Sequence, residues 1–103
     1  MNTIETWDSI IDKINDTRKP YTEFKLNQDS VLRLFKVDAP DHLYKWHFDE
    51  EDRIIEPFIK NDWKFQYDNE IPIHLSRKIK IKKNEYHRVI KGTHNLPILI
   101  KFK

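Results

Sequence analysis

Histidine and carboxylate side chains in two separated segments are the groups in this sequence best suited to chemistry. His47 is followed closely by Asp49 and Glu51, and His87 lies in a second polar segment much further along the chain. Imidazole nitrogens and carboxylate oxygens together form binding sites for divalent transition metals. If the fold brings the two segments together, these residues form one polar site.

Around His47, residues 43–49 alternate between two kinds of side chain. Every second side chain is aromatic: Tyr44, Trp46 and Phe48. The intervening side chains are polar: Lys45, His47 and Asp49. This period of two predicts a short strand over residues 44–48, since successive side chains of a strand point to opposite faces. Either the aromatic face lies in the core and His47 faces water, or the polar face lies inside and the aromatic face is covered from outside.

The first segment resembles the first motif of the cupin superfamily, a group of small antiparallel barrels. In that motif, His-x-His is followed three or four residues later by Glu. Here the pattern reads His47-x-Asp49, and Arg53 stands where the family has Glu. A carboxylate thus replaces the second histidine, whereas a guanidinium cannot bind a metal. In a second register, Lys45 and His47 align with the histidine pair and Glu51 aligns with the glutamate.

The second segment resembles the second cupin motif, Pro-x-Gly-x-x-His. Here it reads Lys82-x-Asn84-x-x-His87. Asn84 suits the position of the family's glycine because asparagine tolerates a left-handed turn. The resemblance covers about residues 30–103 and leaves two ligand sets open. One set is His47, Asp49 and His87, and the other is His47, Glu51 and His87.

The cupin resemblance implies a divalent-metal site with ligands drawn from His47, Asp49, Glu51 and His87. The ion could be Fe, Mn, Ni or Zn, because this donor set does not distinguish them. A small metalloenzyme acting on a small polar molecule would need further groups beside the metal. The candidates for catalysis are Arg53 and Tyr86, and the candidates for ligand binding are Lys45, Arg53 and Arg88.

Two other functions stay open at this point. A metal-free barrel could hold an anionic small molecule through Lys45, Arg53 and His87, by charge-assisted hydrogen bonds. A module that binds nucleic acid or protein could use the basic strands after Arg77. The net charge of only +2 and the acidic segment 49–52 argue against a nucleic-acid partner. A homodimer is a further expectation, because a second subunit could cover the aromatic face of segment 43–49.

An amphipathic helix is predicted over residues 2–16, followed by strands. Apolar residues recur there at helical spacing: Ile4, Trp7, Ile10, Ile11 and Ile14. Asn2 and Glu5 have the spacing of a capping box. After Pro20, short alternating segments separated by polar turns predict strands at 20–26, 31–37, 44–48, 53–59, 63–67, 71–75, 78–81, 86–90 and 97–102. Pro57 interrupts one of them and is expected on an edge or at a bulge.

Turns at this regular spacing are typical of a sandwich or barrel. With the cupin resemblance, the expected fold is all-β: an antiparallel double-stranded β-helix, or cupin-like jelly roll, with one N-terminal helix. The chain of 103 residues is expected to form a single domain, with residues 1–19 as the helix and residues 20–103 as the barrel.

Composition excludes several classes of site. The sequence has no cysteine, so disulfides, thiolate metal sites and cysteine nucleophiles are absent. Its beginning lacks the pattern of a secretory signal, and no apolar stretch is long enough to cross a bilayer. These features predict a cytoplasmic protein with no membrane partner.

Overall fold

A computed structural model describes residues 19–102, which form eight β-strands and one short 3-10 helix. The first three elements are β1 (Tyr21–Asn27), β2 (Ser30–Phe35) and the 3-10 helix η1 (Asp41–Leu43). The other strands are β3 (Arg53–Pro57), β4 (Lys64–Tyr67), β5 (Ile73–His74), β6 (Ile79–Ile81), β7 (His87–Ile90) and β8 (Leu96–Phe102). The predicted helix at residues 2–16 lies outside the described residues.

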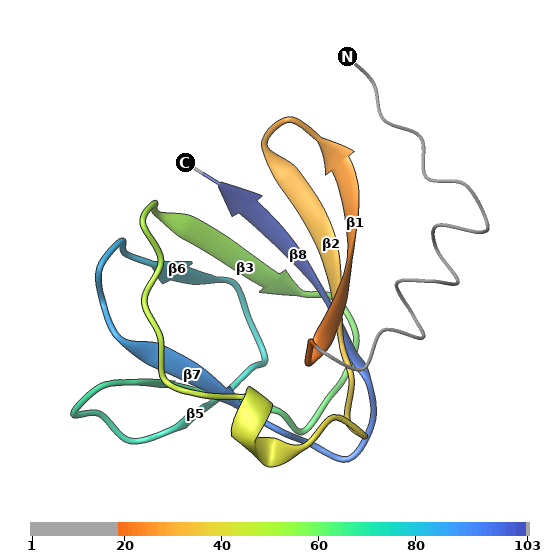
Figure 1. Ribbon diagram of the computed structural model, residues 1–103, viewed down its shortest axis with the longest axis vertical. Helices are drawn as coiled ribbons and strands as arrows, with labels where there is room; N and C mark the ends of the chain where they lie inside the picture. Colours follow the sequence, from red (N-terminus) through yellow and green to blue (C-terminus); the bar gives the residue numbers. More distant parts are fainter. Residues whose placement is uncertain (1–18, 103) are drawn as a thin grey trace.

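The strands form two antiparallel sheets that face each other. The larger sheet has the order β1-β2-β8-β3-β6, and the smaller sheet has the order β5-β4-β7. In Figure 1 the larger sheet crosses the upper part of the molecule, with β8 between β2 and β3, and the smaller sheet lies below it. The prediction of an all-β, antiparallel, jelly-roll-like fold is confirmed.

The core lies between the two sheets and is built from alternating positions. In β8, Leu96, Ile98 and Ile100 are buried and share one face. Ile79 and Ile81 of β6 are buried in the same way, with the exposed Lys80 between them. Trp63, just before β4, and Phe65 of β4 contribute the largest buried side chains on the side of the smaller sheet. This period of two is why the sequence predicts most strands within two or three residues.

Pro57 does not lie on an edge strand, because β3 pairs with β8 on one side and with β6 on the other. Pairing with β6 stops at Ile55, two residues earlier, while Pro57 is still opposite Ile98 of β8. The proline is therefore the last residue of its strand, where its missing N–H breaks no ladder bond to β6.

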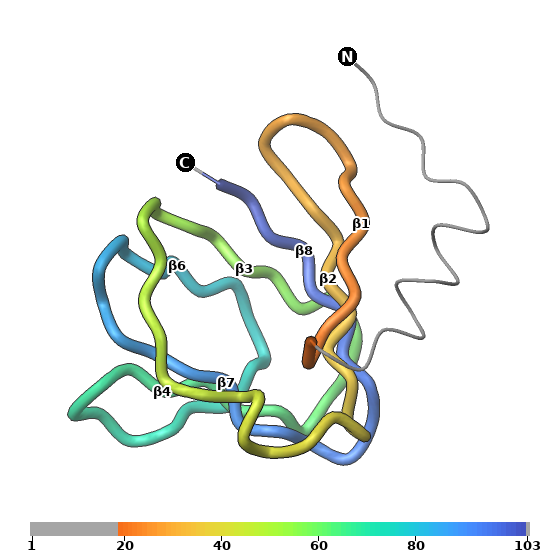
Figure 2. Tube along the Cα trace, in the orientation of Figure 1, coloured from red at the N-terminus to blue at the C-terminus, as the bar shows by residue number. Residues whose placement is uncertain are grey.

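The predicted strand at residues 44–48 is wrong. Residues 44–48 follow η1 and hold coil and one isolated bridge, between His47 and His87. Figure 2 shows the chain crossing from the end of β2 to the start of β3 past β7. Trp46 and Phe48 are exposed, but Tyr44 turns inward, and its hydroxyl lies within hydrogen-bond distance of the backbone carbonyls of Pro20, at 2.8 Å, and Lys36. The aromatic residues therefore do not share one face.

No helix in the part of the chain that the structure describes is long and apolar enough to span a membrane.

Gly92 is the single glycine of the chain, and its neighbours leave no room for a side chain. The Asp62 carboxylate accepts hydrogen bonds from the backbone N–H of Thr93, at 2.9 Å, and from its hydroxyl, at 2.8 Å. A Cβ atom on Gly92 would overlap this carboxylate and lie 2.6 Å from Cδ1 of the buried Trp63. The loop 91–95 can therefore approach β4 only because residue 92 lacks a Cβ.

Gly92→Ala should lower the free energy of unfolding by about 1–3 kcal/mol, the usual cost of forcing extra volume into a packed site. Urea denaturation of the wild type and the variant measures this loss. Ser76→Ala is the matched control, because Ser76 is exposed in another loop. Equal midpoints for Gly92→Ala and the wild type would show that the loop adjusts without cost.

Candidate metal centre

The bridge between His47 and His87 places their imidazoles side by side. The backbone N–H of each residue donates to the carbonyl of the other, at 3.0 and 2.9 Å. Residues that exchange both hydrogen bonds across an antiparallel pair project their side chains to the same face. The two ring centroids are 4.4 Å apart. One pair of backbone hydrogen bonds thus joins the two segments that the sequence singles out.

Each imidazole is oriented by a carbonyl two residues earlier in the chain. His47 Nδ1 lies 3.0 Å from the carbonyl oxygen of Lys45, and His87 Nδ1 lies 2.8 Å from that of Glu85. A carbonyl can only accept, so each neutral ring carries its proton on Nδ1. In this tautomer, Nε2 of each ring carries a lone pair that can bind a cation. Histidines that bind metals are typically held in this way by a backbone carbonyl.

Asp49 lies against both Nε2 atoms. Its Oδ1 is 3.9 Å from Nε2 of His47, and its Oδ2 is 3.3 Å from Nε2 of His87. Asp49 is only 8% exposed, and Oδ2 has no hydrogen-bond partner among residues 19–102. One ligand atom from each of the three residues lies within 4.8 Å of the other two. The result is a compact cluster of acceptor atoms.

The turn before His87 holds Asp49 in place. The backbone N–H of Asn84 donates to the Asp49 carbonyl at 2.8 Å, and that of Lys83 donates to Asp52 Oδ1 at 2.9 Å. Asn84 has a φ of 64°, which is the left-handed conformation expected at this position. The second segment therefore positions the carboxylate as well as supplying a histidine.

Electrostatics favour the metal-binding protonation state of these groups. Burial lowers the pKa of His47, and the nearby His87 and Arg53 lower it further, so the imidazole is neutral at pH 7. Burial raises the pKa of Asp49, but the adjacent His87 and Arg53 outweigh it and hold that pKa below its ordinary value. A neutral imidazole and an ionised carboxylate are the forms that bind metals.

Arg53 is held between two carboxylates. Its Nε and Nη2 donate to Glu51 Oε1 at 3.0 and 2.8 Å, and its Nη1 lies 3.5 Å from Asp49 Oδ1. Glu51 is thus directed at Arg53 and is not one of the three clustered residues. The arrangement corresponds to the register in which Asp49 replaces the second histidine of the cupin motif.

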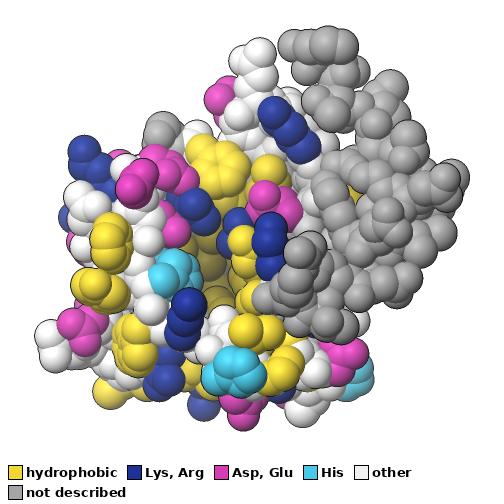
Figure 3. Space-filling model, in the orientation of Figure 1, with side chains coloured by type: hydrophobic (Ala, Val, Ile, Leu, Met, Phe, Trp, Pro, Cys, Tyr) yellow, Lys and Arg dark blue, Asp and Glu magenta, His cyan; other side chains and the backbone are white. Residues whose placement is uncertain are grey.

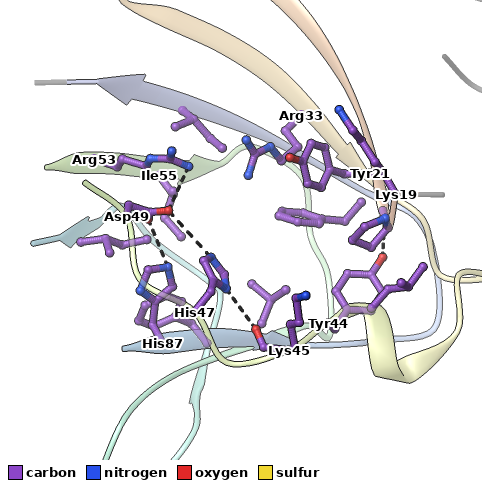
Figure 4. A pocket seen from close by; sticks show the side chains of 17 residues that line it. Lys19, Tyr21, Arg33, Tyr44, Lys45, His47, Asp49, Arg53, Ile55 and His87 are labelled. Carbon is purple, nitrogen blue, oxygen red and sulfur yellow. Dashed lines mark hydrogen bonds and ion pairs between the residues drawn. The ribbon is translucent and has the colours of Figure 1, made fainter. Parts of the chain in front are cut away.

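The cluster lies at one end of a cavity of about 400 Å³ between the sheets. Figure 3 shows the hollow, with hydrophobic side chains at its bottom and charged side chains and a histidine around it. In Figure 4, His47, Asp49 and His87 lie at one side, and Tyr21 and Arg33 lie at the other. The apolar floor consists of Phe35, Ile55, Phe65, Ile81, Val89 and Ile100.

Comparison with solved structures finds the same architecture in proteins of low sequence identity. Protein NMB1881 from Neisseria meningitidis has a TM-score of 0.60 at 13% identity, covering 98% of this chain and 100% of that one. A cupin domain from Bordetella pertussis Tohama I has a TM-score of 0.50 at 14% identity, covering 84% of this chain and 97% of that domain. This protein has a cupin-like fold.

FeII HppE is a further structure similar to the cupin-like barrel, with a TM-score of 0.54 at 11% identity. The match covers 72% of this chain and 41% of HppE. No family model matches the sequence, and no curated protein matches it. At these identities the likeness is one of fold, and the chemistry of the cupin-like barrel depends on its own residues.

The other predicted site residues separate into two groups. Lys45 and Arg53 line the cavity of the cupin-like barrel, but Tyr86 and Arg88 do not. Tyr86 is 49% exposed and packs edge-on against Phe48. Arg88 donates from Nε to Gln66 at 2.9 Å, and its guanidinium lies 4.7 Å from the centre of the Trp46 ring. Both belong to the outer surface.

Arg33 also lines the cavity, although it is not one of the site residues predicted from the sequence. A signal for it exists in the alternation of β2, where Arg33 shares a face with the buried Val31 and Phe35. A charged side chain at an inward position of a strand indicates a paired or functional group.

Proposed function

We propose that the cupin-like barrel binds a divalent metal ion through His47, Asp49 and His87. The observation that carries this proposal is the meeting of two imidazoles and one buried carboxylate, with a ligand atom of each within 4.8 Å of the others. Each imidazole has its Nδ1 at a backbone carbonyl and its Nε2 toward Asp49, whose buried Oδ2 has no hydrogen-bond partner in residues 19–102. Buried polar atoms without partners are costly, and a cation among the three would satisfy them together.

Two imidazoles and one carboxylate suit several ions, with iron, manganese, nickel and zinc all compatible. Such a set leaves coordination positions open on ions that prefer more than three ligands. These three residues line the cavity, so open positions would be accessible to a small molecule within it. We therefore propose a metal-binding barrel that acts on or holds a small polar molecule. Location in the cytoplasm stays a prediction.

One observation favours a second candidate, a metal-free barrel that binds an anionic small molecule. Arg53 Nη1 lies 3.5 Å from Asp49 Oδ1 and already compensates part of the carboxylate's charge. In that case Arg53 would take the place of the ion as the partner of Asp49. However, this ion pair leaves Oδ2 of Asp49 without a hydrogen-bond donor among the described residues. We therefore favour the metal.

Metal titration of protein purified without a His tag tests the proposal. We expect wild-type protein to bind one equivalent of a divalent ion, and His47→Ala and His87→Ala each to weaken binding by at least about 100-fold, since even outer partners of a metal ligand are worth about 10–100-fold. His42→Ala is the matched control, because His42 is exposed in η1 away from the cavity. A wild type that binds none of Fe, Mn, Ni and Zn would favour the metal-free function.

A further inference from the structure

A second cationic group faces the cavity from the wall opposite the imidazoles. Arg33 lies on the inner face of β2, and its side chain is only 12% exposed. Figure 4 shows its guanidinium pointing into the cavity beside Tyr21, across from His47 and Asp49. A long cationic side chain on the inner face of a sheet is rare unless it is paired.

The guanidinium of Arg33 is held rigidly along one edge. Arg33 pairs with Glu23 across β1 and β2, and its Nε and Nη2 both donate to Glu23 Oε1, the Nε bond at 2.9 Å. Its Cζ lies 3.9 Å from the centre of the Tyr21 ring, a cation–π arrangement. Neither of these hydrogen bonds uses Nη1. The group is therefore an oriented donor with hydrogen-bonding capacity left for a ligand.

Cationic groups dominate the described lining of the cavity. Lys19, Arg33, Lys45 and Arg53 line it, whereas Asp49 is its single carboxylate. The two glutamates that pair with the arginines, Glu23 and Glu51, bring the carboxylates to three, so one positive charge remains. A divalent ion beside Asp49 would add to this excess. The charge balance therefore favours an anionic ligand.

The space between the two charged ends is apolar. Phe35, Ile55 and Phe65 are among the side chains that form its floor, and the volume of about 400 Å³ suits a small molecule. Apolar walls disfavour a ligand with several charges, because each buried charge must lose its water. A single carboxylate on an apolar body fits both the apolar floor and the one guanidinium on the wall opposite the imidazoles.

We propose that the cavity binds a small carboxylic acid with an apolar or aromatic body, whose carboxylate accepts from Arg33. The body lies over the apolar floor, and its far end points toward His47, Asp49 and His87. Arg33 is the anchor rather than Arg53, because Arg53 is already shared between Glu51 and Asp49. This inference rests on the proposed function, since the metal would lie at that far end.

Benzoate is a suitable probe, and benzamide is its neutral counterpart of similar shape. Calorimetric titration is done on zinc-loaded protein and on protein freed of metal by a chelator that is then dialysed away. Benzoate should bind at least about tenfold more tightly than benzamide, since a hydrogen bond to a charged group is worth roughly tenfold or more in affinity. Arg33→Gln should remove that preference. Arg88→Gln is the matched control, because Arg88 lies on the outer surface.

The double variant Glu23→Gln/Arg33→Gln removes both charges of the ion pair and leaves neither unpaired, so it tests the same donor if Arg33→Gln alone does not fold. Equal affinity for benzoate and benzamide in the wild type, or an undiminished preference in both variants, overturns the inference. In one outcome, the protein takes up no metal and still prefers benzoate in a way that depends on Arg33. That outcome supports the anion site and overturns the metal site. Zinc uptake without benzoate binding supports the metal site and overturns the anion site.

Discussion

Asp49→Ala should weaken divalent-metal binding by at least about 100-fold, whereas Glu51→Ala should leave it nearly unchanged. The two carboxylates are separated by one residue, yet they differ in what they face. Asp49 lies within reach of both Nε2 atoms, with Oδ2 at 3.3 Å from His87. Glu51 is bound to the guanidinium of Arg53 at 2.8 Å and contributes nothing to the cluster.

Calorimetric titration with zinc or manganese compares the metal affinity of each variant with that of the wild type. Thermal unfolding of the metal-free proteins shows whether Asp49→Ala keeps its fold, so that lost affinity is not mistaken for lost structure. Strong loss in Glu51→Ala with retention in Asp49→Ala would instead indicate the second cupin register, with His47, Glu51 and His87 as ligands.

Trp63→Ala should lower the free energy of unfolding by about 3–5 kcal/mol, the usual cost of truncating a large buried aromatic side chain. Trp63 is 0% exposed, and its ring packs against Phe35 and Tyr44, with ring centroids 5.8 and 5.5 Å away. Its indole N–H donates to the His94 carbonyl at 2.7 Å. The variant therefore leaves a cavity and an unpaired carbonyl.

Trp46→Ala is the matched control, because it removes the same side chain from the surface. Trp46 is 40% exposed, and its main polar neighbour is the guanidinium of Arg88. A cation–π contact at an exposed site is worth about 0.5–1 kcal/mol, so the loss should be of that size. Urea denaturation compares the two variants. Similar losses for both would mean that the exposed aromatic surface contributes as much as the core.

Much of the barrel could be predicted from the sequence because its strands alternate cleanly. Ile79 and Ile81 flank Lys80 in β6, and Ile98, Ile100 and Phe102 recur in β8. Every second side chain is therefore apolar, which matches the alternating faces of a strand. Segment 44–48 alternates equally well but is not a strand. Alternation specifies two faces, and a ladder also needs a partner strand. Here the described segment finds a partner at one residue pair, His47 and His87.

The candidate site was predictable in part. The motif spacing identified His47, Asp49 and His87 as one of two possible ligand sets. The choice between Asp49 and Glu51 could not be made from spacing, since it depends on the turn at Asn84, which binds the Asp49 backbone. Arg33 was missed because its partners, Glu23 and Tyr21, are brought to it by the pairing of β1 with β2. Sequence motifs do not record such cross-strand neighbours.

The position of β8 has a consequence for how the chain reaches this fold. β8 separates β2 from β3, so these strands have no hydrogen bonds to each other and are joined only through residues 96–102. Before β8 inserts, the hairpin β1-β2 and strand β3 each keep an unpaired edge, which can associate with other chains. Contacts between residues far apart in sequence must then form together, and such topologies fold slowly. We therefore expect the larger sheet to close late in folding, when β8 pairs with β2 and β3 together.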